Sequence, residues 1–115
     1  MDVEHLVTPR PAPCAVLDHV ATRGDRVRFR VRQPDGSWLP VTWRAFAQQI
    51  RAVAAGLIGR GIGRGDCVAV FGTNSVAWAA AALGVQAAGA TMVPIYPAST
   101  GEAARYVLEH AEVTT

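Results

Sequence analysis

The chain has 115 residues, half of them hydrophobic, and a formal net charge of +2. This composition indicates one soluble globular domain instead of a disordered chain, and the net charge is too small to attract nucleic acid by itself. The longest nearly apolar stretch, residues 76–90, is interrupted by Gln86 and falls short of the roughly 20 residues that a membrane-spanning helix needs. Residues 1–5 include early acids and begin no apolar stretch, so we expect no secretory leader and a cytoplasmic location.

All eleven basic residues are arginine, and the absence of lysine excludes several chemistries. A phosphate-binding loop with lysine, a Schiff-base amine and a lysine general base are all ruled out. The two cysteines, Cys14 and Cys67, are far apart in the sequence, and Cys67 falls in an expected buried strand. We therefore predict two reduced thiols rather than a disulfide or a metal site.

The N-terminal residues differ in pattern from the rest of the chain. Residues 1–13 contain three prolines and no apolar period, which predicts a loose arm before a domain over residues 14–115. The first expected helix covers residues 15–22 and is short, with three aliphatic side chains on one face.

Residues 26–33 alternate between apolar and basic side chains, which is the period of a half-buried strand. Proline and glycine within residues 34–36 predict a turn, after which residues 37–41 return as a second strand. The expected hairpin has one apolar and one basic face. The apolar side chains are Val27, Phe29 and Val31, and the basic ones are Arg26, Arg28, Arg30 and Arg32.

A long amphipathic helix follows the hairpin. Thr42 is a favourable N-cap, and apolar residues recur at three- and four-residue steps over residues 43–60. Glycine at every second position of residues 59–65 predicts the end of this helix and a tight connection to the next strand.

The centre of the predicted fold is a β-α-β unit. Residues 67–71 form an uncharged strand with β-branched and aromatic members, which we expect to be buried on both faces. Asn74 or Ser75 caps a helix over residues 76–89, which is nearly all apolar and should therefore be interior or covered. Residues 91–96 form a second strand, parallel to the first.

The last segment contains one more helix and the start of a strand. Ser99 or Thr100 caps a helix over residues 101–111, whose inner side is apolar. Residues 113–115 have the pattern of a further strand. The predicted fold class is therefore α/β, a layered parallel-sheet domain preceded by a β-hairpin.

Three segments are candidates for phosphate or nucleotide binding. Residues 59–65 lack the spacing of the dinucleotide fingerprint and precede a strand instead of following one, which favours a structural connection. Residues 72–75 lie between a strand end and a helix start, where backbone amides can hold an anion; the alternative is a capped turn without a ligand. The arginine side of the hairpin could meet phosphates, or form a solvated face that pairs with acids elsewhere.

Two acid-histidine pairs, Asp18-His19 and Glu109-His110, are adjacent in sequence. Neighbouring positions on a helix point in different directions, so neither pair forms a local acid–base dyad. The three histidines also lack metal-ligand spacing with either cysteine; they are His5, His19 and His110. Three hydroxyl residues are sufficiently explained as helix caps: Ser75, Ser99 and Thr100. We therefore predict no catalytic, cofactor-binding or metal-binding residue in this chain.

Six motifs follow one another in a recognisable order: Thr42-Trp43-Arg44, residues 61–70, residues 74–78, residues 87–90, the Val-Pro-Ile-Tyr-Pro run of residues 93–97, and Ser99-Thr100. Their order resembles the N-terminal segment of AMP-forming acyl-CoA synthetases, and the Val-Pro-Ile-Tyr-Pro run most resembles long-chain fatty-acid ligases. The resemblance covers about residues 17–113. One departure is Val76-Ala77 before Trp78, where family members usually have Pro-Glu.

The resemblance implies an incomplete form of the first subdomain of adenylate-forming enzymes. It also implies, for the full enzyme, activation of a fatty acid by ATP and magnesium to an acyl adenylate, and transfer to coenzyme A. The phosphate loop, the nucleotide contacts, the magnesium glutamate and the catalytic lysine lie later in such proteins, so none is carried over to a residue here. We expect no cofactor site in this chain, no ligase activity of the chain alone, and the remainder of the synthetase as its partner.

Two other hypotheses stay open. The chain could be a stand-alone α/β binding or interaction module derived from such an enzyme, which should be monodisperse and unfold cooperatively. A fragment should instead expose an apolar helix and a sheet edge. The chain could also be a small nucleotide-binding domain that uses residues 72–75, which requires saturable protection of that turn by ATP from hydrogen exchange.

Overall fold

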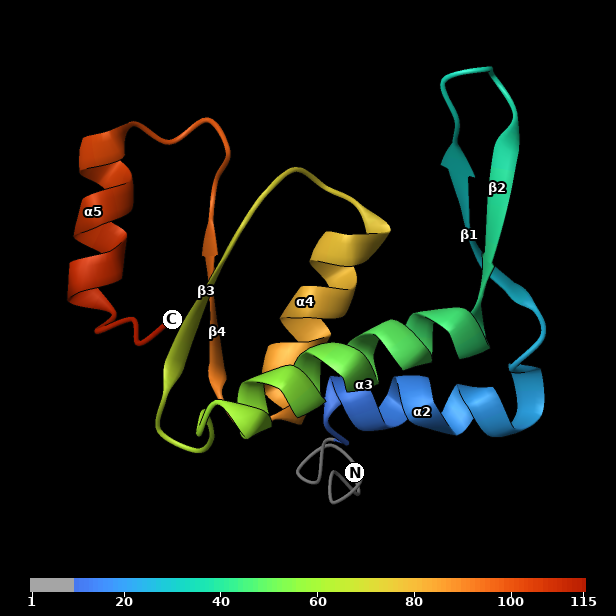
Figure 1. The fold of residues 1–115 in the computed structure, drawn as a ribbon, viewed down its shortest axis with the longest axis horizontal. Coiled ribbons are helices and arrows are strands. Elements are labelled where there is room, and N and C mark those ends of the chain that lie inside the picture. Colours follow the sequence, from blue (N-terminus) through green and yellow to red (C-terminus); the bar gives the residue numbers. More distant parts are fainter. Residues whose placement is uncertain (1–9) are drawn as a thin grey trace, which may run out of the picture.

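The computed structural model describes residues 10–115, so His5 and most of the expected N-terminal arm lie outside the described residues. The described part has four helices and four strands (Figure 1). In chain order they are α2 (Ala12–Arg23), β1 (Val27–Arg32), β2 (Trp38–Thr42), α3 (Trp43–Gly59), β3 (Cys67–Phe71), α4 (Val76–Ala87), β4 (Thr91–Ile95) and α5 (Gly101–His110). The predicted α/β class and every predicted element except the opening of a last strand are present within a few residues.

The β-α-β unit forms as predicted. Strands β3 and β4 pair in parallel, from Cys67 opposite Thr91 to Phe71 opposite Ile95, and α4 connects them. The chain end adds to the same sheet, because the Thr114 N–H donates to the Cys67 carbonyl and the Ala69 N–H donates to the Thr115 carbonyl, both at 2.8 Å. Residues 113–115 form no regular strand, although these two backbone bonds place them beside β3, where the predicted strand would begin.

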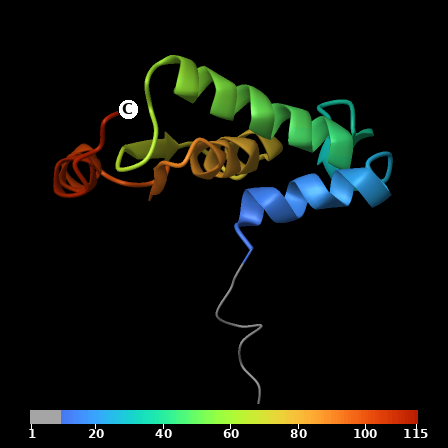
Figure 2. The same ribbon diagram turned by 90° about the horizontal axis from the view of Figure 1, so that it is seen from below.

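Helix α3 lies against α4, with α2 alongside both (Figures 1 and 2). The close approach of α3 and α4 depends on Gly84, because a Cβ there would lie 2.5 Å from Cβ of Val53. Two apolar clusters flank this contact. One contains Phe46, Ile50 and Ala80 with Phe29 from the hairpin, and the other contains Ile62, Val68, Val70, Val85 and Ala90.

Three burial predictions are wrong in the same way. Strand β3 is not buried on both faces, because Val68 and Val70 are buried whereas Phe71 is 65% exposed. Helix α4 is not fully interior, since Ala77 and Gln86 are exposed. Helix α5 buries none of its side chains. The described residues cover only part of the apolar surface of each element, so sequence hydrophobicity overstates burial here.

The hairpin is confirmed, with one irregularity. Strands β1 and β2 pair antiparallel, and the register shifts between Val27 and Phe29. This bulge leaves Val27 42% exposed, although alternation predicts it on the apolar side. Gly36 closes the turn with a φ of 86°, which glycine adopts without strain. Phe29 packs edge-on against Phe46, with ring centroids 4.9 Å apart, and so joins the hairpin to α3.

The first helix begins earlier than predicted, at Ala12 instead of residue 15. Proline is compatible with the first turn of a helix, because its missing N–H would have no partner there, and Pro13 is buried. Both cysteines are free thiols, as predicted. Within residues 10–115, no helix combines the length and the apolar character that crossing a bilayer requires.

Candidate functional site

The candidate site is a pocket at the carboxyl ends of β3 and β4. In parallel α/β sheets, this is the edge where ligands bind. The pocket has a volume of about 270 Å³, near the lower end for small-molecule sites. Its lining residues are Gly72, Asn74, Trp78, Pro94, Ile95, Tyr96 and Pro97.

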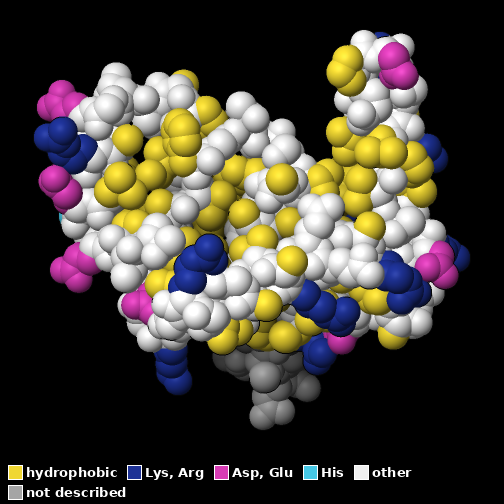
Figure 3. Space-filling view, in the orientation of Figure 1, with side chains coloured by type: hydrophobic (Ala, Val, Ile, Leu, Met, Phe, Trp, Pro, Cys, Tyr) yellow, Lys and Arg dark blue, Asp and Glu magenta, His cyan; other side chains and the backbone are white. Residues whose placement is uncertain are grey.

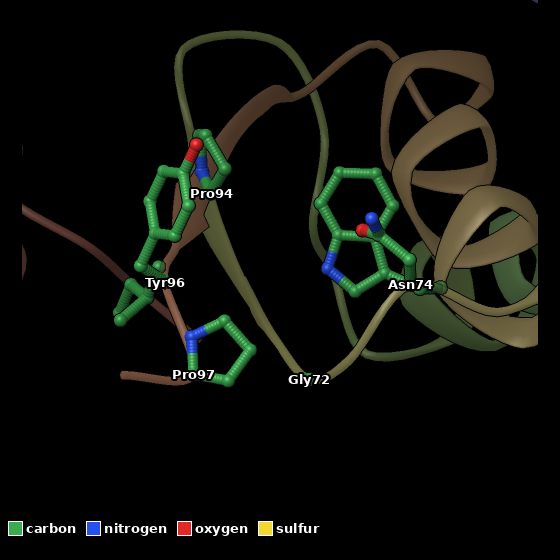
Figure 4. A pocket seen from close by; sticks show the side chains of 7 residues that line it. Gly72, Asn74, Pro94, Tyr96 and Pro97 are labelled. Atoms are coloured by element: carbon green, nitrogen blue, oxygen red, sulfur yellow. The ribbon is translucent and has the colours of Figure 1, made fainter. Parts of the chain in front are cut away.

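Two segments distant in sequence form the walls of this pocket. Tyr96 and Pro97 follow β4 on one side, and Asn74 lies opposite them across the opening, with Gly72 between (Figure 4). The in-register pairing of Phe71 with Ile95 brings the ends of the two strands together. Tyr96 is 80% exposed, so its ring borders the pocket without being held by packing.

The turn over residues 72–75 forms one wall and ends in a helix cap. The Ser75 hydroxyl accepts a hydrogen bond from the Trp78 N–H at 3.0 Å, so Ser75 acts as the N-cap of α4, not as a free nucleophile. Asn74, the other cap candidate, lines the pocket instead. The predicted capped turn is therefore present, and the cap leaves the Asn74 amide available to a ligand.

The lining residues limit the chemistry of the pocket. They are mostly apolar, and their polar side-chain groups are the Asn74 amide, the Tyr96 hydroxyl and the Trp78 indole N–H. The lining contains no carboxylate, imidazole or thiol that could act as a general acid or base. The pocket can therefore hold a small apolar or aromatic group and orient it with one or two hydrogen bonds.

A second, wider groove lies on the other side of the same turn. Its volume is about 620 Å³. It is bordered by β1 and by the start of α4, through Phe29, Arg30, Val31, Arg32, Asn74, Ser75, Val76 and Ala77. Asn74 is thus shared between the groove and the pocket.

The other candidate residues predicted from the sequence do not line the pocket. Residues 59–65 form a turn in which the Asp66 carboxylate accepts a hydrogen bond from the Gly63 N–H at 2.8 Å. Asp18 pairs with Arg10 at 2.6 Å, whereas His19 contacts the Trp43 ring. His110 stacks on Tyr106. These contacts place the acid–histidine pairs on separate elements, far from any shared centre.

Thr100 caps α5 by accepting from the Ala103 N–H, while the Ser99 backbone N–H donates to the Tyr96 carbonyl. Residues 10–115 contain no cluster of three His, Cys, Asp or Glu side chains able to hold a metal ion. The donor set of the described residues therefore does not fit the magnesium of an adenylate-forming enzyme.

Reasoning from the residues alone found one wall of the pocket and missed the other. Residues 72–75 are a candidate from the sequence because they follow a strand, whereas Pro94 and Tyr96 enter only through the family resemblance. The same rule points to both segments, because Tyr96 also follows a parallel strand. What the sequence does not show is the register that places the two strand ends side by side.

Comparison with known proteins agrees with this architecture. Residues 16–115 match the family of AMP-binding enzymes. The long-chain-fatty-acid–CoA ligase FadD15 of Mycobacterium bovis is 40% identical over 97 residues, which cover 84% of this chain and 16% of that protein. An uncharacterized protein of Mycobacterium tuberculosis is 35% identical over 109 residues, covering 94% of this chain and 61% of that protein.

Solved structures show the same fold. The N-terminal subdomain of NpsA from Klebsiella oxytoca superposes with a TM-score of 0.79 at 27% identity, over 91% of this chain and 26% of that one. The chain thus spans a small part of the length of the ligase and of the subdomain it matches. The chain belongs to the family of AMP-binding enzymes and corresponds to part of the N-terminal subdomain of adenylate-forming members, with long-chain fatty-acid–CoA ligases among its relatives.

Proposed function

We propose that this chain forms the N-terminal segment of an AMP-dependent long-chain fatty-acid–CoA ligase. The full enzyme would activate a fatty acid with ATP and transfer the acyl group to coenzyme A. The observation that carries the proposal is the 40% identity with FadD15 over 84% of the chain. The two free thiols and the use of ATP and coenzyme A support a cytoplasmic location.

Within such an enzyme, the proposed role of the segment is to build scaffold. The Thr114 and Thr115 backbone bonds extend the sheet beyond β3, so the remainder of the synthetase is the proposed partner that continues it. The exposed side of β3 and α5 provides apolar surface for that packing. Burial of such surface contributes about 25 cal/mol per Å².

The proposal includes the absence of ligase activity in the isolated chain. Adenylate formation requires stabilisation of phosphate charge by lysine, metal or loop amides, whereas the chain has no lysine and the pocket offers only an amide, a phenol and an indole N–H. The purified 115-residue chain, incubated with fatty acid and ATP, should release no pyrophosphate. Release that depends on fatty acid would contradict the proposal.

The same assay can be combined with hydrogen exchange to test the nucleotide-binding hypothesis. If residues 72–75 form a capped turn without a ligand, ATP should leave the exchange of their own backbone N–H groups unchanged; the Trp78 N–H, which Ser75 already protects, serves as an internal reference. Saturable protection of residues 72–75 by ATP would assign them a nucleotide role in this chain and contradict the proposed scaffold role.

A second candidate function is a stand-alone interaction module. It is favoured by the uncharacterized Mycobacterium tuberculosis relative, which is short enough for this chain to span 61% of it. A module should be monodisperse and unfold in one cooperative transition without binding a hydrophobic dye. Dye binding and aggregation would instead indicate that Phe71 and α5 need the remainder of a synthetase to cover them.

A further inference from the structure

The hairpin formed by β1 and β2 projects from the body of the protein (Figures 1 and 3). The pairing places Arg30 opposite Pro40 and Arg32 opposite Trp38, so these four side chains share one side of the hairpin. Arg28 lies at the bulge near its base. We call Arg30, Arg32 and Trp38 the arginine face; all three are exposed, as is Arg28 beside them.

The arginines of this face have no acidic partner among residues 10–115. The ion pairs there are Arg10 with Asp18 and Arg44 with Asp25. Asp35, in the hairpin turn, accepts from the Ser37 hydroxyl at 2.6 Å and from the Ser37 N–H at 2.9 Å. The prediction that the arginines pair with acids elsewhere is therefore not fulfilled in the described part of the chain.

Aromatic rings hold two of the guanidinium groups in place of carboxylates. Arg28 lies 4.5 Å from the centroid of Phe29 and 5.0 Å from that of Trp43. Arg32 lies 5.5 Å from the centroid of Trp38, which is itself 55% exposed. A guanidinium over an aromatic ring keeps its N–H donors free for an anion. The face is thus cationic and aromatic at once.

The size of the face decides between two kinds of anionic partner. Strands of six and five residues at about 3.4 Å per residue and 4.8 Å between strands give a face of roughly 200 Å². A stable protein interface needs about 800 Å² per partner. A phospholipid surface sets no such minimum area, because each basic residue near an anionic surface adds about 1 kcal/mol of attraction, and attachment through a small number of them is weak and reversible.

We infer that the arginine face docks the protein on an anionic phospholipid surface, with the guanidinium groups against lipid phosphates and Trp38 at the level of the headgroups. Arginine matches phosphate through paired N–H donors, and tryptophan prefers the membrane–water interface. The attachment is peripheral and reversible, and it weakens with salt because the charges are exposed.

The test is co-sedimentation of the 115-residue chain with vesicles of phosphatidylcholine alone or mixed with phosphatidylserine. The hairpin variant is Arg30→Glu/Arg32→Glu. Its matched control is Arg51→Glu/Arg105→Glu, which makes the same charge change at exposed positions of α3 and α5. Far-ultraviolet circular dichroism verifies that each variant is folded.

Binding should require phosphatidylserine and should fall at least about 25-fold in the hairpin variant, since each arginine near an anionic surface contributes roughly a factor of five. The binding of the control variant to the same vesicles should fall only a few-fold. The inference is wrong if the chain does not bind these vesicles, if neutral vesicles bind equally well, or if the control loses as much as the hairpin variant. Binding to a polyglutamate peptide but not to vesicles would overturn it in favour of an acidic protein partner.

A second measurement leaves the arginines unchanged. The variant Trp43→Phe/Trp78→Phe keeps Trp38 as its single tryptophan. Phosphatidylserine vesicles should shift its emission to shorter wavelength, and lipids brominated near the headgroup should quench it. Emission that stays unshifted and unquenched while the protein is bound to the vesicles would exclude Trp38 from the contact and contradict the inference.

Discussion

Replacing Gly84 by alanine tests the contact between α3 and α4. A Cβ at this position would lie 2.5 Å from both Cβ and Cγ1 of Val53, and 3.1 Å from the Ile50 carbonyl oxygen. Rotation about χ1 cannot move Cβ of Val53, so the helices must separate. Overpacking of this kind costs about 1–3 kcal/mol, whereas alanine gains about 1 kcal/mol over glycine in a helix interior. We expect Gly84→Ala to lower the free energy of unfolding by up to about 2 kcal/mol.

The matched control is Gly56→Ala in α3, where the new Cβ would meet nothing closer than the Arg60 guanidinium at 3.5 Å. This variant should raise the free energy of unfolding, by up to about 1 kcal/mol. Urea denaturation followed by circular dichroism measures both changes. If Gly84→Ala stabilises the chain as much as Gly56→Ala does, the close approach of α3 and α4 is not present.

Val53→Ala provides a second check, because it removes Cγ1 and leaves Cβ. In a double-mutant cycle, Gly84→Ala should cost less in the Val53→Ala background than in the original chain, with a coupling of about 0.5 kcal/mol or more. Strict additivity would mean that Cγ1 of Val53 does not oppose the Cβ added at position 84, since the contact with Cβ of Val53 is the same in both backgrounds.

Three further predictions concern single side chains. Thr42→Ala removes the hydroxyl that accepts from the Ala45 N–H at 3.1 Å and should destabilise the chain by about 1 kcal/mol in urea denaturation, with Thr42→Ser as the control that keeps the cap. Val85 is 1% exposed, so Val85→Ala should lower the free energy of unfolding by about 2–3 kcal/mol, since two buried methyl groups are replaced by a cavity. An unchanged free energy of unfolding would place Val85 outside the core. Hydrogen bonds from the Ser37 hydroxyl and, to a smaller extent, from the Ser37 N–H hold the pKa of Asp35 below its ordinary 3.8. The ionised Asp35 carboxylate therefore stabilises the folded chain above pH 3.8, and this stabilisation is lost as the pH falls through the lower pKa of the folded state. The free energy of unfolding should therefore fall less on acidification in Asp35→Asn than in the original chain. An equal fall in the two proteins would refute this prediction.

Local signals in the sequence predict the local structure of this fold well. Thr42, Ser75 and Thr100 each cap the helix expected to follow them, because a hydroxyl before an apolar run satisfies helix N–H groups that have no other partner. The parallel pairing of β3 and β4 also follows from chain order, since a crossover helix leaves little alternative.

Features that depend on distant residues are less visible. Phe71 has the character of a buried strand residue, yet it is 65% exposed because burial depends on what covers the sheet. The pocket needs Asn74 and Tyr96 on adjacent strand ends, and this depends on a register that the sequence does not encode locally. Arg32 pairs with Trp38 and not with an acid, which requires the hairpin register as well.

The central claim is that this segment provides scaffold for a ligase site that lies elsewhere in the enzyme. The most direct test replaces the matching 97 residues of FadD15 with this chain and measures pyrophosphate release that depends on fatty acid, beside the chain alone and FadD15 without the segment. The chimera should be active, and the other two proteins should be inactive. Activity of the chain alone, or a folded chimera without activity, would contradict the claim.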